Sequence, residues 1–110
     1  DVYKRQVVAP ANVPLTVTSP NGGEVITMGE LITITWNSNP AMVGDTVRIG
    51  LHKGTDFLGW VVWECPNTGI FQDVIPAGLV PAGSDYRIRV QSASNRALRD
   101  LSDYFFSLVD

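Results

Sequence analysis

The chain has 110 residues, enough for one ordinary domain, and its 45% of hydrophobic and 17% of charged residues exclude an intrinsically disordered protein. A formal net charge of −3, with no basic run beyond Lys4 and Arg5, argues against nucleic acid or an anionic membrane as partner, because both attract clustered cations. The apolar stretches are only a few residues long, so we expect no transmembrane segment, which needs about 20 residues.

Residues 1–14, DVYKRQVVAPANVP, combine charged residues with two prolines and have no sustained hydrophobic period. We interpret them as an N-terminal leader or linker. The periodic pattern that begins at residue 15 assigns residues 15–110 to one folded module.

Apolar and polar residues alternate in several segments of the module, which is typical of half-buried β-strands. Residues 15–18 and 32–36 alternate apolar residues with threonine, and Pro20 to Gly23 supply the dihedral angles of a tight turn between them. The same period returns at 47–52 and 86–91, and the last strand, 103–109, is expected to leave Phe105 outward. The residues predicted to face the core are Leu15, Val17, Ile32, Ile34, Trp36, Val47, Ile49, Leu51, Tyr86, Ile88, Val90, Phe106 and Leu108.

Less regular strands are predicted at 57–64 and 69–75, and turn residues recur every 8 to 12 positions or so. This spacing predicts an all-β fold, an immunoglobulin-like β-sandwich of seven or eight antiparallel strands. The only candidate for a helix is the segment NRALRDL, residues 95–101.

The sequence offers little material for catalysis or metal binding. The single histidine, His52, is expected on the exposed side of a strand, and the single cysteine, Cys65, excludes an internal disulfide and a cysteine-based metal site. Asp100 and Asp103 are too few for a calcium loop. The other acids have no distinctive spacing for glycoside cleavage, namely Asp45, Asp56, Glu64 and Asp73. We therefore expect no enzyme, no metal and no cofactor.

The tryptophans are the most informative of the remaining side chains, because indole rings stack on sugars and anchor protein interfaces. Trp36 continues the inward series and belongs to the core. Trp60 and Trp63 differ in parity, so on a regular strand they point to opposite faces and one of them is exposed, unless a bulge intervenes.

A second candidate surface follows from strand pairing, because the third, sixth and seventh strands of an immunoglobulin-like sandwich share one sheet. Guanidinium groups beside an aromatic ring on that sheet would suit an acidic partner or a polar glycan. The alternative is that they only keep the face soluble. The outward side chains expected there are Arg48, His52, Arg87, Arg89, Gln91 and Phe105.

Several segments together resemble one known family. These are LTVTSPNGGEVITMGELITITW, VRIGLHKG, PNTGIFQDVIPAGLVPAGSDYRIRVQSASN and SDYFFSLV, which cover most of residues 15–109. They look like the Ser-Thr-rich, GPI-anchored family module, also known as the Kre/Knh-like N-terminal domain. The resemblance implies an immunoglobulin-like module of secreted and cell-wall proteins, extracellular or at the cell surface, without catalytic residues.

Two departures from the family pattern are visible. The chain has Asp73 where the family typically carries an aromatic residue, and Trp60 where the family is usually polar, so we expect Trp60 to be the exposed indole. The Ser/Thr-rich tail of fungal members does not follow, which favours a prokaryotic or isolated module over a GPI-anchored one.

Three functional hypotheses result. The first is a non-catalytic structural or adhesive module, or a spacer, in contact with neighbouring protein modules. The second is a carbohydrate-binding module that recognises cell-wall polysaccharide, with contacts from Trp60, Arg48, Arg87, Arg89 and Phe105. The third is a fibre subunit that self-associates by adding residues 1–14 as a strand to a neighbour's sheet.

Overall fold

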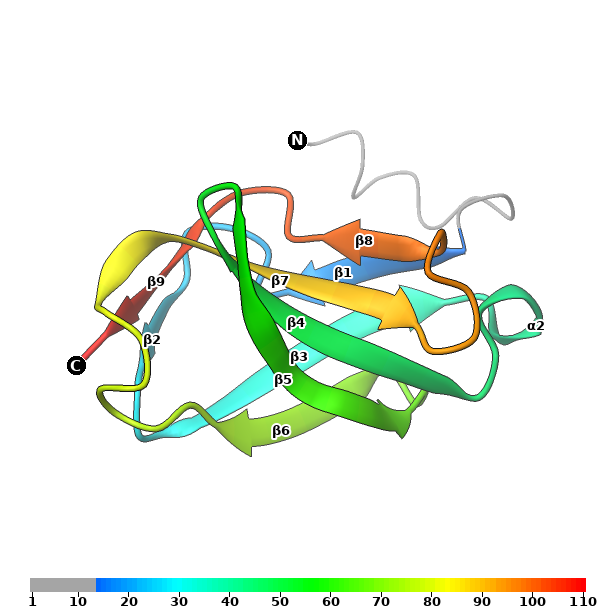
Figure 1. Ribbon diagram of the computed structural model, residues 1–110, viewed down its shortest axis with the longest axis horizontal. Coiled ribbons are helices and arrows are strands. Elements are labelled where there is room, and N and C mark those ends of the chain that lie inside the picture. Colours follow the sequence, from blue (N-terminus) through cyan, green and yellow to red (C-terminus); the bar gives the residue numbers. More distant parts are fainter. Residues whose placement is uncertain (1–13) are drawn as a thin grey trace.

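A computed structural model describes residues 14–110 of the chain (Figure 1). Apart from Pro14, the predicted leader or linker and its proposed strand lie outside the described residues. The elements of the described part are β1 (Leu15–Ser19), β2 (Val25–Thr27), β3 (Leu31–Ser38), α2 (Pro40–Val43), β4 (Thr46–Lys53), β5 (Asp56–Pro66), β6 (Ile70–Val74), β7 (Gly83–Ser92), β8 (Arg99–Leu101) and β9 (Phe106–Val109).

The strands form two facing sheets, as Figure 1 shows. One sheet has three strands in the order β1-β3-β6, and the other has six, in the order β2-β9-β7-β4-β5 with β8 beside β7. The prediction of an all-β chain is confirmed. The described residues contain nine strands rather than seven or eight, and the pair β2 and β9 is parallel.

The extra strands have a local cause at the turn that follows β1. Pro20 has no N–H to donate to a ladder, and the turn at residues 20–24 carries the chain from one sheet to the other. There Val25 pairs with Ser107 of β9. The last part of the described chain adds two short strands to the same sheet. These strands, β8 and β9, both pair with β7.

The core lies between the two sheets. Every side chain that the alternation predicts to face inward is at most 5% exposed, from Leu15 to Leu108. Val43 and Met28, which come from the connections, are also buried there. Burial of alternate apolar residues from both sheets removes most of the strands' apolar area from water and is the main stabilising contribution to the fold.

The turn SPNGGE, residues 19–24, is fixed by the segment that precedes β9. The Asn21 side chain donates to Asp103 Oδ2 (2.9 Å) and accepts from the Asp103 backbone N–H (2.7 Å). The buried Ser102 hydroxyl donates to the Pro20 carbonyl oxygen at 2.6 Å. The turn SPNGGE and the segment SDYFFSLV therefore fix each other's position through these hydrogen bonds.

The corner PNTG, residues 66–69, supports the core tryptophan. Asn67 Oδ1 accepts from the indole N–H of Trp36 at 2.8 Å and from the Ser38 hydroxyl at 3.0 Å, while Asn67 Nδ2 donates to the Gly44 carbonyl at 2.9 Å. A buried indole N–H needs such a partner, because an unsatisfied donor costs about 1–3 kcal/mol. The corner therefore stabilises the end of β3.

The segment at residues 95–101, the only helix candidate in the sequence, does not form a helix. Its last three residues form β8, because they pair with β7 and complete the sheet edge. The helix in the described residues is the four-residue α2, which Asn39 caps by accepting from the Ala41 N–H. Within residues 14–110, no helix has the length and apolarity needed to cross a bilayer.

The two tryptophans Trp36 and Trp63 allow a matched test of the fold. Trp36 is 2% exposed and Trp63 is 57% exposed. Trp36→Ala is expected to lower the free energy of unfolding by about 3–5 kcal/mol, as a large-to-small change in a core. Trp63→Ala should cost only about 1 kcal/mol, from lost ring and cation contacts. Urea unfolding measures both, and equal midpoints for the parent and Trp36→Ala would contradict the strand assignment.

Candidate functional site

The strand β5 has an irregular register against β4, which sets the direction of its tryptophans. Ile49 pairs with Val62 but the next residue, Gly50, pairs with Trp60, so one residue, Val61, is extra on β5. Such a bulge breaks the two-residue alternation of a strand.

Trp60 and Trp63 consequently lie on the same outward face, with ring centres 5.7 Å apart. Opposite faces were expected for Trp60 and Trp63 unless a bulge intervened, and the bulge at Val61 is present. Trp60 is only partly exposed, because the rings of Phe57 and Trp63 pack against it. The more exposed indole is Trp63, so the expectation for Trp60 is wrong.

Four rings form a continuous row across β4 and β5. The ring centres are 5.2 Å apart for His52 and Phe57, 4.9 Å for Phe57 and Trp60, and 5.7 Å for Trp60 and Trp63. Neighbouring planes meet at 61° to 80°, which is the edge-to-face geometry that aromatic pairs favour. We call these four residues the aromatic row.

Gly50 makes room for the aromatic row. It is the β4 residue opposite Trp60, and a Cβ atom there would lie 2.6 Å from Phe57 Cε1 and 3.3 Å from Trp60 Cε3. The missing side chain therefore lets two rings lie directly over the strand. Glycine inside a strand often marks such a close approach.

Arginine side chains lie over the rings. The guanidinium carbon of Arg48 is 3.8 Å from the ring centre of Trp63, and that of Arg89 is 5.3 Å from Phe57 and 5.4 Å from Trp60. These distances are within the range of cation–π attraction. Arg87 is next to Arg89 on the same side of β7. The aromatic row together with Arg48, Arg87 and Arg89 is called the basic aromatic face below.

The structure thus brings together four of the five predicted site residues, namely Trp60, Arg48, Arg87 and Arg89. The fifth, Phe105, lies beside Arg87, whose guanidinium carbon is 5.9 Å from its ring centre. Gln91, also expected outward, is 1% exposed, because it packs beside Arg89 and accepts a hydrogen bond from it. Phe57 and Trp63 were missed as site residues.

The arginines have few acidic partners. Among the described residues, the ion pair on this face joins Arg48 to Glu64, at 3.5 Å. Arg87 donates instead to the Ser102 carbonyl oxygen at 2.9 Å, and Arg89 to the Gln91 side chain. The buried Nε atoms of Arg48 and Arg89 have no hydrogen-bond partner. The face therefore carries an excess of positive charge.

This excess acts on the pKa values of the face. Burial lowers the pKa of His52 below its ordinary value of 6.5, and the positive charges of Arg89, Arg87 and Arg99 lower it further. The pKa of Arg89 is also lowered, first by burial and then by Arg99 and Arg96. Both shifts have the same two causes, burial first and the charge of neighbouring arginines second.

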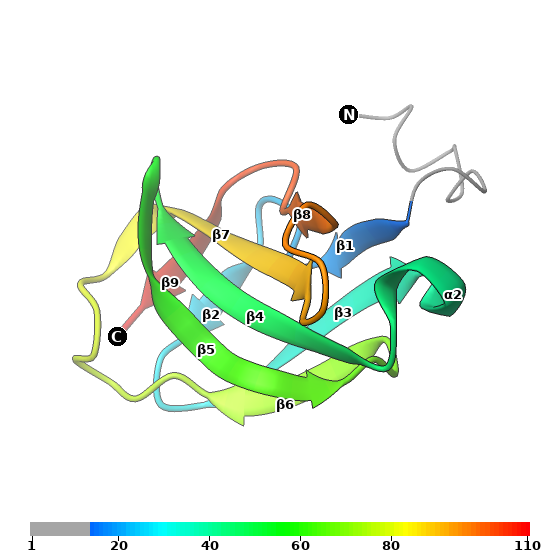
Figure 2. The same ribbon diagram turned by 45° about the vertical axis from the view of Figure 1, so that its right-hand side comes forward.

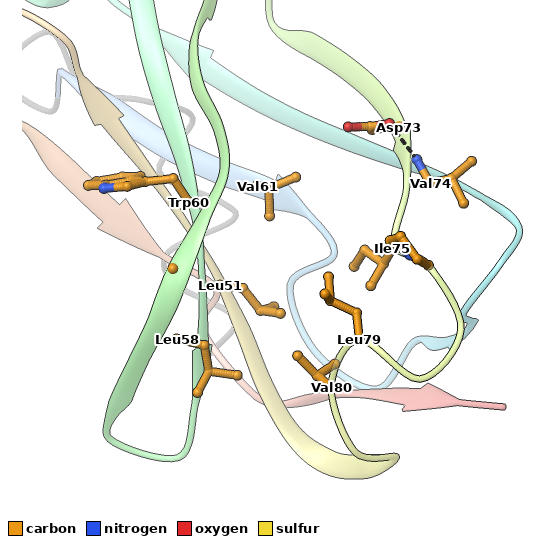
Figure 3. A pocket seen from close by; sticks show the side chains of 11 residues that line it. Leu51, Leu58, Trp60, Val61, Asp73, Val74, Ile75, Leu79 and Val80 are labelled. Atoms are coloured by element: carbon orange, nitrogen blue, oxygen red, sulfur yellow. Dashed lines mark hydrogen bonds between the residues drawn. The ribbon is translucent and has the colours of Figure 1, made fainter.

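A second feature is an apolar groove of about 450 Å³ between the edge strands β5 and β6. Figure 2 shows these two strands along the same side of the molecule. In Figure 3 the side chains of Val61 and Leu79 point into the groove, while Trp60 projects from the other side of β5. Asp73 is the one acidic residue that lines it, and this carboxylate accepts from the Val74 N–H at 2.7 Å. The groove thus lacks a paired acid and base.

Other chemistry is sparse in the part of the chain that the structure describes. Residues 14–110 contain no group of three or more His, Cys, Asp or Glu side chains arranged to hold a metal ion. Cys65 is a buried free thiol, and burial raises its pKa, which disfavours the reactive thiolate. The arrangement is suited to binding through stacking and charge.

Compared with known proteins, the chain matches no protein-family model, no curated protein and no solved structure. The resemblance to the Ser-Thr-rich, GPI-anchored family module stays a hypothesis.

The contact between Gly50 and Phe57 generates the first prediction for this face. Gly50→Ala should destabilise the protein by about 1–3 kcal/mol, because the new methyl group overpacks against the Phe57 ring. In a Phe57→Ala background the same change should cost less, by about 0.5 kcal/mol or more, because the obstacle is gone. Additive effects in a urea-unfolding double-mutant cycle would contradict the contact.

The lowered pKa of His52 predicts a pH effect on stability. The unfolded state binds a proton at His52 more readily than the folded state, so this residue contributes a loss of stability as the pH falls below 6.5. His52→Gln removes that contribution. The stability of the parent relative to His52→Gln, measured by urea unfolding, should decrease from pH 7.5 to pH 5 (about one unit above and about one and a half below the ordinary value). A constant difference would contradict the shift.

Proposed function

We propose that the chain is a non-catalytic, immunoglobulin-like module of an extracellular or cell-surface protein, and that it binds cell-wall polysaccharide on the basic aromatic face. The sheet membership supports the immunoglobulin-like arrangement: β1, β3 and β6 in one sheet and β4, β7 and β9 in the other, which is the usual division of such sandwiches. The hydrogen bond from the Tyr86 hydroxyl to the Pro81 carbonyl, five residues upstream, supports it further, because it resembles the tyrosine corner of that fold.

The observation that carries the binding function is the exposed aromatic row with arginines over its rings. An indole that is 57% exposed on a sheet face costs solubility, and exposed aromatic patches commonly mark binding sites. The row is held by a bulge in β5 and by Gly50, both of which depart from regular strand construction. A spacer module has no need of these features.

The other two hypotheses have less support. A purely structural role accounts for the sandwich but leaves the aromatic row unexplained. Self-association through residues 1–14 depends on a segment outside the described residues. We therefore propose adhesion through polysaccharide binding as the function.

Tryptophan fluorescence tests this proposal. A soluble β-glucan and polygalacturonate, a polymer of an acidic sugar, are titrated into the protein, and at least one is expected to shift the emission. Trp63→Ala should weaken that binding about tenfold, the loss of a typical anchoring aromatic residue.

The matched control is Leu79→Ala, which removes an exposed apolar side chain from the groove. It should leave the affinity unchanged. Loss of binding in Leu79→Ala but not in Trp63→Ala would move the site to the groove. If neither polymer binds at millimolar sugar concentration, the proposed function is wrong.

A further inference from the structure

The arginines of the basic aromatic face are arranged to accept acidic groups. A guanidinium carries five N–H donors in a planar fork, so it can keep one hydrogen bond to a neighbour and still bind a carboxylate. The guanidinium carbon of Arg89 is 5.3 Å from the ring centre of Phe57 and 5.4 Å from that of Trp60, and its Nη2 donates to the Gln91 side chain. Within residues 14–110, neither Arg89 nor Arg87 forms an ion pair with a carboxylate.

The distribution of charge is the second argument. The chain as a whole has a formal net charge of −3, yet this face gathers Arg48, Arg87 and Arg89 with one acidic partner, Glu64. Arg99 is close enough to lower the pKa values of both His52 and Arg89. A cationic patch on an acidic protein favours an anionic ligand and disfavours other acidic surfaces of the same protein.

We infer that the ligand of the basic aromatic face is an acidic polysaccharide, an inference that rests on the proposed function. Its sugar rings contact Trp63 and Trp60, and its carboxylates bind Arg89 and Arg87. A uronic acid unit carries an apolar C–H face and a carboxylate on one six-membered ring. It therefore matches indole rings and guanidinium groups that lie within 6 Å of each other. An acidic peptide offers the carboxylates without the ring.

The geometry of the aromatic row also selects the form of the polymer. Its neighbouring ring planes are inclined by 61° to 80°, so the row is not a flat platform. A crystalline polysaccharide surface needs coplanar rings, whereas a single flexible chain follows inclined ones. The ligand is therefore a single soluble chain.

The experiment compares two polymers that have the same sugar backbone and differ at the carboxyl group. Polygalacturonate and its fully methyl-esterified form have the same backbone, but the ester has no carboxylates. Binding to the parent protein is measured by calorimetry, and the acidic form is expected to bind about tenfold more tightly or better, because each charge-assisted contact contributes a factor of this size. The affinity should fall between about 0.05 and 0.5 M salt, as screening increases.

Arginine variants locate the charge effect. Arg89→Ala should weaken binding of polygalacturonate about tenfold. Arg89→Lys, which keeps the charge but loses the planar fork, should recover only part of the affinity. Arg96→Ala is the matched control, because it removes the same charge from an exposed loop and leaves the aromatic row untouched. Circular dichroism and thermal unfolding verify that each variant is folded.

The outcomes separate the two proposals. Equal affinity for the acidic and esterified polymers would overturn the inference and leave the proposed function standing. If poly-glutamate binds as tightly as polygalacturonate, the partner is an acidic protein segment and the inference is wrong. Equal losses in Arg89→Ala and Arg96→Ala would also overturn it, because net charge rather than the stacked guanidinium would then act. Absence of binding to both polymers would overturn the inference, and the proposed function is overturned as well only if the soluble β-glucan also fails to bind.

Discussion

One extra residue in β5 determines the character of the outer sheet face. Because Val61 has no counterpart on β4, Trp60 and Trp63 project to the same side, and Gly50 leaves the space in which the rings lie. A regular strand would direct one of the two indoles into the core or the groove. The shared face of Trp60 and Trp63 follows from this local departure from alternation, and a second register shift, between Leu51 and His52, brings Phe57 to the same side.

The two turn motifs, PNTG and SPNGGE, serve a different purpose from the face. Asn67 of the PNTG corner satisfies the buried indole of Trp36, and Asn21 of the SPNGGE turn binds the segment before β9. Both asparagines satisfy polar groups where the chain passes between sheets, which is where an unpaired donor would cost most. The two turn motifs thus stabilise the corners of the sandwich, and neither contributes a side chain to the basic aromatic face.

Much of the fold follows from the sequence, because alternation is a local property. The inward rows of β1, β3, β4 and β7 are read directly from side-chain type, and the shared face of Arg48, Arg87 and Arg89 follows from parity within each strand. The bulge in β5 does not, since it depends on register against β4. Gly50 and Gly59 inside strands were the available signal of irregularity. The parallel pairing of β2 with β9 depends on contacts more than eighty residues apart along the chain.

The central claim is that Trp60 and Trp63 lie in contact on one outward face. Two-dimensional NMR measures this most directly, through nuclear Overhauser contacts between their ring protons, which should be strong for ring centres 5.7 Å apart. The side-chain protons of Arg48 should also be shifted by the ring current of Trp63. Contacts from Trp63 to core residues such as Ile34, with none to Trp60, would contradict the account.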